Sequence, residues 1–331
     1  MLTLRGNGSR MKKPRPRPQL SHRREYERRV NRVMDHVQAH LADELTLERL
    51  ASVAAFSPFH FHRVFAAVTG ETLSDYIRRI RLERAASYLG LLRETSVLDI
   101  ALRCGFSSAA AFARAFKGHF GMSATEWRDG GALRWSESKR RKANSKPGQA
   151  EGKTGKAARA GKGHLSSVRS DGAAMPVEIR KLPPCRVAYM RHVGPYGVEG
   201  RIGLLWKEFE RWIKARDLRQ PGMLTIGIGH DAPRIVEADK LRYDACLVVG
   251  PDFKADRFVN VADLPGGTYA IMPFDGTPCE ISSAWERLFT WLPSSGYQPD
   301  ERPCLELRSD RDPLGSSGRL HCELCLPVGP L

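Results

Sequence analysis

The stretch Leu50–Gly70, LASVAAFSPFHFHRVFAAVTG, decides the fold of the first half of this chain, because it recurs as Ile100–Gly121, IALRCGFSSAAAFARAFKGHFG. The first part of the second copy follows at an offset of 50 positions and the rest at an offset of 51, so one inserted residue relates the copies. Each copy reads as a short helix, a turn and a second helix. The repeat therefore predicts two helix-turn-helix units on one chain, a pattern typical of DNA recognition.

Start and stop signals separate the helices of this half. Ser57-Pro58 places a capping side chain and then a proline at the start of one helix, and Gly70 follows the end of that helix. Thr72 then caps a longer helix whose apolar residues recur at helical spacing. We expect an all-α domain over residues 24–130, preceded by a disordered basic tail over residues 1–23.

The second helix of the first unit has one apolar face and one outer face. The apolar spacing leaves Phe59, His62 and Arg63 on the outer face. An arginine there can form two hydrogen bonds with guanine or hold a phosphate. The outer face of the second unit carries mainly alanines, with Arg114 and Lys117 available to phosphates. We expect the first unit to read bases directly and the second unit mostly to position the DNA backbone.

The net charge of +16 is concentrated in two segments. Residues 1–29 and residues 136–170 each carry +8, whereas residues 30–135 carry +2 and residues 171–331 carry −2. The composition of residues 131–174, rich in Lys, Gly, Ser and Ala, predicts a flexible linker. Basic arms increase sequence-independent attraction to phosphates, although solvated linkers have the same composition. A weakly specific DNA-coating protein is therefore an alternative interpretation.

Cysteine usage and hydropathy bear on the class of protein. The 7 cysteines lack the spacing of a disulfide framework, which indicates reduced thiols. No apolar run approaches the ~20 residues that a membrane helix needs. No apolar stretch follows the basic N-terminal residues, so we expect no secretory signal. Cys322 and Cys325 form a CxxC pair, but on a strand they face opposite sides and do not easily share a metal. We expect a cytoplasmic, nucleoid-associated protein without cofactor, metal or membrane partner.

The second half of the chain is also duplicated. Val177–Gly194 matches Val259–Gly276 at an offset of 82, and Asp244–Pro251 matches Glu323–Pro330 at an offset of 79. Short alternating apolar runs indicate strands, so each copy reads strand, strand, helix, strand, strand. We expect residues 175–331 to form an α+β domain with a cleft between the two copies.

One set of residues in the first half is shared with a known family. It comprises Arg81-Leu82-Glu83-Arg84-Ala85, Ile100-Ala101, Gly105-Phe106, Phe112, Phe116-Lys117, Phe120-Gly121 and Ser123. On these residues, segment 46–128 resembles the DNA-binding domain of the AraC/XylS transcription regulators. The resemblance implies seven helices in homeodomain-like units, two recognition helices ~34 Å apart in adjacent grooves of promoter DNA, and RNA polymerase as a further partner. The base-reading positions that it implies are Phe59, His62, Arg63, Ala109, Ala110, Ala111 and Arg114.

Three segments of the second half carry a looser resemblance, namely His192–Tyr196, Tyr243–Cys246 and Glu323–Val328. On these segments, residues 177–331 resemble the gyrase-inhibitor-like effector domain of Rob-like and multidrug-sensing regulators. The resemblance implies a duplicated SHS2-type fold whose cleft binds amphipathic, often cationic aromatic, small molecules. We expect the Glu323 carboxylate to anchor the cation, because a buried charge needs a partner. The candidate aromatic walls are Tyr196, Trp206, Tyr269, Phe274 and Trp285.

Alternatives to these expectations stay open. By spacing alone, Glu323 is better interpreted as a surface residue paired with an arginine. Some related stand-alone domains resemble hydrolases of strained-ring toxins, in which Glu323 and Tyr196 would act as general base and orienting acid. The main expectation is a transcription regulator without enzymatic activity that senses a small effector. Coupling between its halves would require the two domains to dock, because a flexible linker transmits no torque.

Overall fold

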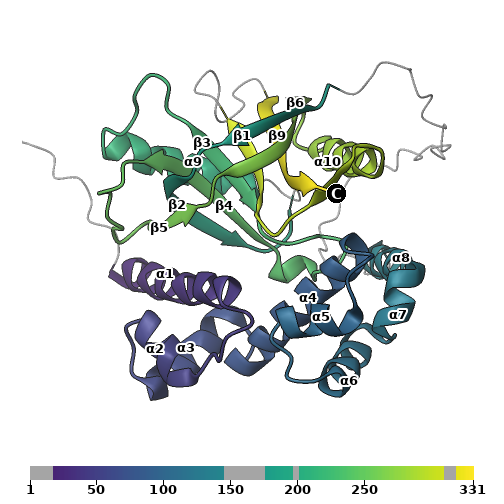
Figure 1. The fold of residues 1–331 in the computed structure, drawn as a ribbon. Coiled ribbons are helices and arrows are strands. Elements are labelled where there is room, and N and C mark those ends of the chain that lie inside the picture. Colours follow the sequence, from purple (N-terminus) through teal and green to yellow (C-terminus); the bar gives the residue numbers. More distant parts are fainter. Residues whose placement is uncertain (1–17, 145–175, 197–200, 309–317) are drawn as a thin grey trace, which may run out of the picture.

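The computed structural model describes residues 18–144, 176–196, 201–308 and 318–331 of the chain. The first of these ranges is helical, and the other three form a sheet with helices against it (Figure 1). The helical part consists of α1 Pro18–Ala39, α2 Leu47–Val53, α3 Pro58–Thr69, α4 Leu73–Leu91, α5 Val97–Arg103, α6 Ala109–Phe120, α7 Ala124–Glu126, η1 Trp127–Gly131 and α8 Ala132–Asn144.

The predicted local signals mark the ends of these helices. Pro58 stands at the start of α3, and Gly70 ends it with a φ of 73°, in the left-handed region that glycine adopts without strain. Gly121 ends α6 in the same way, with a φ of 71°. The Thr72 hydroxyl accepts a backbone hydrogen bond at the start of α4, as its capping role requires. The two copies therefore have matching recognition helices.

Two apolar cores lie along α4, one for each helix-turn-helix unit. The first packs Phe61 and Phe65 of α3 against the N-terminal half of α4, together with α1. The second packs Phe112 and Phe116 of α6 against the C-terminal half of α4, together with Trp127. Because one continuous helix contributes to both cores, it sets the orientation of the two units relative to each other.

The expected boundaries of the helical domain differ from the structure at both ends. Helix α1 begins at Pro18, inside the expected tail of residues 1–23, and buries one apolar face in the first core. Helix α8, Ala132–Asn144, occupies the start of the expected linker of residues 131–174, because Trp135 packs against aromatic rings of the second core. An amphipathic helix can carry many Lys and Arg residues on its outer face, so composition alone misplaces such ends. The rest of both segments lies outside the described residues.

The second part of the chain is an antiparallel sheet with two helices on one face. Its order is β1-β6-β9-β8-β3-β4-β2-β5, and β7 pairs with β9. The first copy has the predicted order of strand, strand, helix, strand, strand, whereas the second has one additional short strand, β7, between its helix and β8. Strands β3 and β8 pair where the copies meet. The elements are β1 Glu178–Leu182, β2 Cys185–Val193, α9 Arg201–Ala215, β3 Thr225–Gly229, η2 Ala238–Lys240, β4 Arg242–Val249, β5 Asn260–Leu264, β6 Gly267–Gly276, α10 Ile281–Trp291, η3 Leu292–Ser294, β7 Tyr297–Pro299, β8 Cys304–Arg308 and β9 Leu320–Pro330.

The two faces of this sheet have different neighbours. On one face, which we call the helix face, α9 and α10 each cover an apolar cluster, one for each copy. On the opposite face, side chains from both copies, including Tyr189 and Tyr269, form a third buried cluster. Since neighbouring residues of a strand point to opposite faces, each strand supplies both environments.

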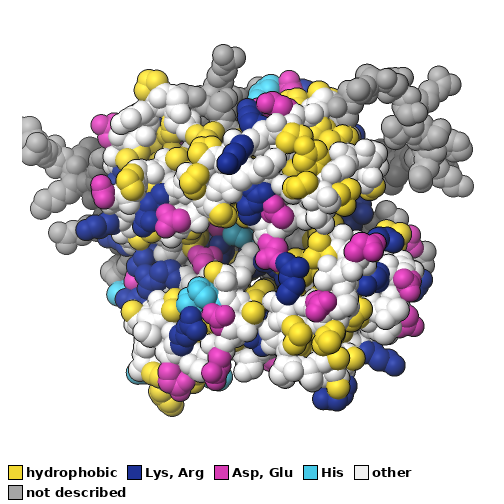
Figure 2. Space-filling view, in the orientation of Figure 1, with side chains coloured by type: hydrophobic (Ala, Val, Ile, Leu, Met, Phe, Trp, Pro, Cys, Tyr) yellow, Lys and Arg dark blue, Asp and Glu magenta, His cyan; other side chains and the backbone are white. Residues whose placement is uncertain are grey.

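The helical part docks against the sheet, with α1 alongside β2 and β5 (Figure 1). Arg191 of β2, whose side chain is 1% exposed, lies 2.7 Å from an Asp35 oxygen of α1 and 2.6 Å from an Asp244 oxygen of β4. Asn260 of β5 exchanges two hydrogen bonds with Arg28 of α1. Charged side chains line the boundary between the two parts (Figure 2). The docking that ligand-dependent coupling requires is therefore present.

Candidate DNA-recognition face and effector site

The recognition helix α3 presents its predicted residues to solvent. Phe59 is 71% exposed, and His62 and Arg63 are also exposed. Helix α1 lies between α3 and the sheet, so the sheet part does not cover this region (Figure 1). Arg63 makes no ion pair with another residue in the described part of the chain. Its guanidinium is therefore available to a base or a phosphate.

Helix α6 presents the second predicted set at the lower edge of the view (Figure 1). Ala109, Ala110, Arg114 and Lys117 are exposed, whereas Ala111 is half-buried. Lys and Arg side chains reach the surface at this edge (Figure 2). The two sets thus lie on helices that pack against the same helix, α4, on the side away from the sheet (Figure 1).

A cluster of buried polar side chains lies on the helix face where the two copies meet. We call Trp206, Tyr243, Glu306 and Arg308 the Glu306 cluster. The Tyr243 hydroxyl donates to Glu306 Oε2 at 2.7 Å, and Arg308 donates to the same oxygen at 2.7 Å. Trp206 Nε1 and Arg308 donate to the Tyr243 hydroxyl oxygen at 3.3 and 3.1 Å. All four residues are buried. Trp206 lies on α9, Tyr243 on β4, and both Glu306 and Arg308 on β8.

Gly227 of β3 makes room for this cluster. It pairs with Glu306 on one side and with Ala245 of β4 on the other. A Cβ at this position would lie 2.1 Å from the Tyr243 hydroxyl oxygen and 2.7 Å from Glu306 Oε2. A larger residue would therefore push apart the hydroxyl and the carboxylate that the glycine allows to meet.

Burial sets the protonation state of the cluster. Burial raises the pKa of Tyr243 well above its usual value, although Arg308 opposes this effect, so the phenol remains a donor. Burial alone would lower the pKa of Arg308, but the neighbouring Tyr243 and Glu306 oxygens raise it above its ordinary value. The cluster therefore contains a charged guanidinium beside a phenol that keeps its proton.

Glu323, the expected anchor of a cationic ligand, is not part of this cluster. It lies on β9 between Cys322 and Leu324, both of which belong to the apolar cluster under α10. Strand alternation turns Glu323 to the opposite face, where it pairs with Arg180 of β1 and its side chain is 40% exposed. The structure matches the alternative interpretation, a surface carboxylate paired with an arginine.

The expected aromatic walls are distributed over three places. Trp206 belongs to the Glu306 cluster, and Tyr196 packs edge-on against Tyr243 with ring centres 6.1 Å apart. Phe274 and Trp285 pack in the apolar cluster under α10. Tyr269 is buried on the opposite face of the sheet. The structure therefore brings only some of the predicted side chains to one site.

The hydrolase pair suggested as an alternative is not brought together. The Tyr196 hydroxyl donates to the backbone oxygen of Arg242, whereas Glu323 pairs with Arg180. Sequence reasoning missed Glu306 and Arg308. Their signal was the alternation Cys304-Leu305-Glu306-Leu307-Arg308, which puts two opposite charges on one face of a strand.

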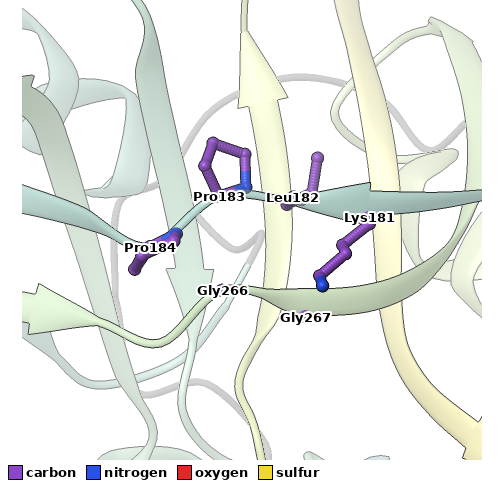
Figure 3. Close-up of a pocket in the computed structure, with 6 residues that line it drawn as sticks. All are labelled: Lys181, Leu182, Pro183, Pro184, Gly266 and Gly267. Carbon is purple, nitrogen blue, oxygen red and sulfur yellow. The ribbon is translucent and has the colours of Figure 1, made fainter.

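A separate surface pocket lies where the β1–β2 and β5–β6 connections meet (Figure 3). Its lining residues are Lys181, Leu182, Pro183, Pro184, Gly266 and Gly267. Lys181 is the charged side chain of this set, and no acidic side chain faces it from the same lining. Within the described ranges, no group of three or more His, Cys, Asp or Glu side chains is arranged to hold a metal. No helix of the described part is long and apolar enough to span a bilayer.

Comparisons with known proteins match both halves of the chain. Residues 50–130 match a family model described as a helix-turn-helix domain, and residues 175–329 match a GyrI-like small molecule binding domain. The chain is 32% identical over 99 residues to the HTH-type transcriptional activator AarP of Providencia stuartii, a match that spans 30% of this chain and 73% of AarP. It is 38% identical over 92 residues to the Right origin-binding protein of Escherichia coli K12, spanning 28% of this chain and 32% of that protein.

A solved structure of an AraC-type transcriptional regulator from Chromobacterium violaceum has 26% identity to the chain, and the match covers 32% of this chain and 94% of that one with a TM-score of 0.31. Together with the exposed recognition helices and the duplicated sheet, the sequence matches identify the chain: it belongs to the AraC-type transcriptional regulators, with a DNA-binding helix-turn-helix domain followed by a GyrI-like small-molecule-binding domain.

Proposed function

We propose that α3 and α6 bind one side of a promoter duplex and that an aromatic small molecule at the Glu306 cluster changes this binding through the docked interface. The observation that carries the proposal is the segment Lys240–Tyr243, which contacts the recognition domain at one end and the Glu306 cluster at the other. We further propose that the regulator acts at the nucleoid in the cytoplasm. Its partners there would be promoter DNA, a small effector and RNA polymerase.

The DNA-binding step rests on the shared helix α4. It joins the two cores, so the exposed residues of α3 and α6 keep a constant relative position. Phe59, His62 and Arg63 supply base contacts, and Arg114 and Lys117 supply phosphate contacts from the alanine-rich second helix. A single chain therefore recognises an asymmetric site without needing a second copy.

The coupling step rests on strand alternation in β4. Tyr243 points to the helix face and donates to Glu306, whereas its neighbour Arg242 points to the recognition domain. Arg242 is buried, pairs with Asp231 at 2.6 Å and donates to the Tyr76 hydroxyl of α4 at 3.2 Å. A ligand that moves Tyr243 therefore moves a group that touches the helix joining the two units.

A second contact from the same segment reaches the recognition helix itself. Lys240 donates to the backbone oxygen of Thr69 at 2.9 Å, and Thr69 is the last residue of α3. Lys240 also lies 3.7 Å from Glu71. A carbonyl at the C-terminal end of a helix attracts a cation, so this contact positions α3. Coupling between two sites of this kind is typically worth ~1–3 kcal/mol, or about 5- to 150-fold in affinity.

The test begins with DNA fragments from the source genome that the full chain retains. Sequencing them should show a shared asymmetric motif with two contacted segments about one helical turn apart. A titration in rising salt separates this proposal from a DNA-coating protein, whose affinity falls to the same non-specific level on every sequence. Retained fragments without a common motif would contradict sequence-specific recognition.

The effector step is tested separately by thermal unfolding with a library of aromatic compounds. A compound bound at the Glu306 cluster should raise the melting temperature of the wild-type chain and should shift its affinity for the retained DNA. Tyr243→Phe should reduce both effects because it removes the hydroxyl shared by three neighbours. Equal responses of wild type and variant would place the effector elsewhere.

A further inference from the structure

Arg308 lies in the position that a cationic ligand of the Glu306 cluster would take. Its guanidinium carbon is 4.4 Å from the centre of the Trp206 ring, and it donates to Glu306 Oε2 at 2.7 Å. An aromatic face and a carboxylate are the two groups that bind an organic cation in a buried site. Arg308 already contacts both groups, the Trp206 ring and the Glu306 carboxylate.

A cationic ligand could bind only after Arg308 had left this position. Arg308 is 95% buried, so its removal would leave either a guanidinium without its carboxylate or a second positive charge next to the ligand. The wild-type cluster therefore selects against cations.

The cluster offers a different group to a ligand. Arg308 Nε is buried and has no hydrogen-bond partner among the residues that the structure describes. A buried donor without an acceptor is unfavourable by about the free energy of one hydrogen bond, so a ligand that brings an acceptor is favoured there. A carboxylate is the strongest such acceptor for a guanidinium.

We propose that Arg308 is an internal occupant of the cation subsite and that the site takes planar aromatic carboxylates in place of aromatic cations. The inference rests on the proposed function, because it assumes that the Glu306 cluster is the effector site. From the sequence alone, Glu323 and the aromatic residues indicated a cationic ligand. The proposed ligand is an anion.

The test uses calorimetry on the full chain with two probes that share one ring system, 2-naphthoate and 2-naphthyltrimethylammonium. Wild type should bind the carboxylate about tenfold or more tightly than the cation. Arg308→Met, which removes the charge and keeps an unbranched side chain, should reverse this order by exposing Glu306 and the Trp206 face to the cation. Glu306→Gln combined with Arg308→Met should remove the preference for either charge.

Two outcomes would overturn the inference. One is a wild-type chain that binds the cation as tightly as Arg308→Met does, and the other is an Arg308→Met chain that gains no affinity for the cation. The thermal melting of each variant and its affinity for the retained DNA check that it is folded. The double variant has no unpaired buried charge, so it provides a folded reference if the single variant is unstable.

This test is separate from the test of the proposed function. If neither probe binds at the Glu306 cluster while another compound still shifts DNA affinity, the proposed regulatory function is retained. Only the proposed position and chemistry of the ligand are then wrong. If the chain retains no specific DNA, the proposed regulatory function is contradicted, even if Arg308→Met reverses the ligand preference.

Discussion

At the scale of single residues, small differences decide whether a site exists. Gly227 and Glu306 are paired across the line where the two copies meet, so one copy contributes a carboxylate and the other contributes the space that it occupies. The repeat is therefore symmetric in its strands but asymmetric in its chemistry. The same holds for Arg63 and for the alanines of α6, which give the two recognition helices different outer faces.

Gly227→Ala should destabilise the chain by ~1–3 kcal/mol, because the added Cβ would overlap the Tyr243 hydroxyl oxygen at 2.1 Å. Urea unfolding measures the change. Gly203→Ala in α9 is the matched control, since nothing lies within 4 Å of its Cβ position, and it should be neutral or slightly stabilising. Equal stability of Gly227→Ala and wild type would show that the Glu306 cluster tolerates the intrusion.

Arg63→Ala should weaken binding to the specific site by ~1–3 kcal/mol and relax the preference at one base pair, because the guanidinium is exposed and we propose that it contacts a base. Fluorescence anisotropy with the site and its single-base variants measures both effects. Lys214→Ala, an exposed position on α9, serves as the control for lost positive charge. A loss of the same size on every DNA sequence would instead assign Arg63 to the phosphates.

At the scale of elements, α4 does more than connect the two units. Its middle faces the sheet part, where Glu83 lies among Arg84, His230, Asp231 and Arg242 at the boundary. Burial raises the pKa of Glu83 to about 7, although Arg79, at 2.9 Å, opposes this effect. Helix α4 therefore carries a carboxyl that titrates close to neutrality at the interface between the two domains.

The sign of its pH dependence follows from the raised pKa. The folded chain binds this proton more tightly than the unfolded chain, so Glu83 contributes stability below its ordinary pKa of 4.5 that is lost as the pH rises through about 7. Glu83→Gln mimics the protonated form. Its free energy of unfolding, relative to wild type, should therefore increase from about pH 5 to about pH 8 in urea titrations. A difference that stays constant with pH would rule out this titration.

At the scale of the whole molecule, the described helical part and sheet part are docked against each other. Helix α1, α4 and the end of α3 all contact the sheet part through charged groups, including Asp35–Arg191 and Lys240–Glu71. Buried ion pairs contribute little net stability, but removing one partner destabilises the protein because the other charge stays buried and unpaired. Such an interface suits a regulator, because it specifies one arrangement without holding it strongly.

Lys240→Met should leave effector binding intact and reduce the effect of the effector on DNA affinity several-fold, because it removes the contact between η2 and the end of α3. DNA affinity measured with and without effector reports the loss. Lys254→Met, at an exposed position of the same domain, is the matched control. An unchanged response in Lys240→Met would show that the signal passes through Arg242 and Tyr76 alone.

The sequence by itself determined the local structure and the two repeats. Capping residues, glycine positions and apolar spacing act over a few residues, so the helix ends at Pro58, Gly70 and Gly121 follow from chemistry that the chain carries locally. The exposed side chains of α3 and α6 follow from the same spacing. Repetition at offsets of 82 and 79 also predicted the order of strands and helices in the second half, apart from the short strand β7.

Only the tertiary structure decided which groups meet. Trp206, Tyr243 and Glu306 are far apart in the chain and come together because β4 and β8 both pair with β3 under α9. A shift of one residue in a strand turns every side chain to the opposite face, so strand register excludes Glu323 from the cluster and admits Glu306. The contacts between the two domains likewise depend on the surfaces that α1, α4 and β4 present after folding, and no short stretch of sequence contains that information.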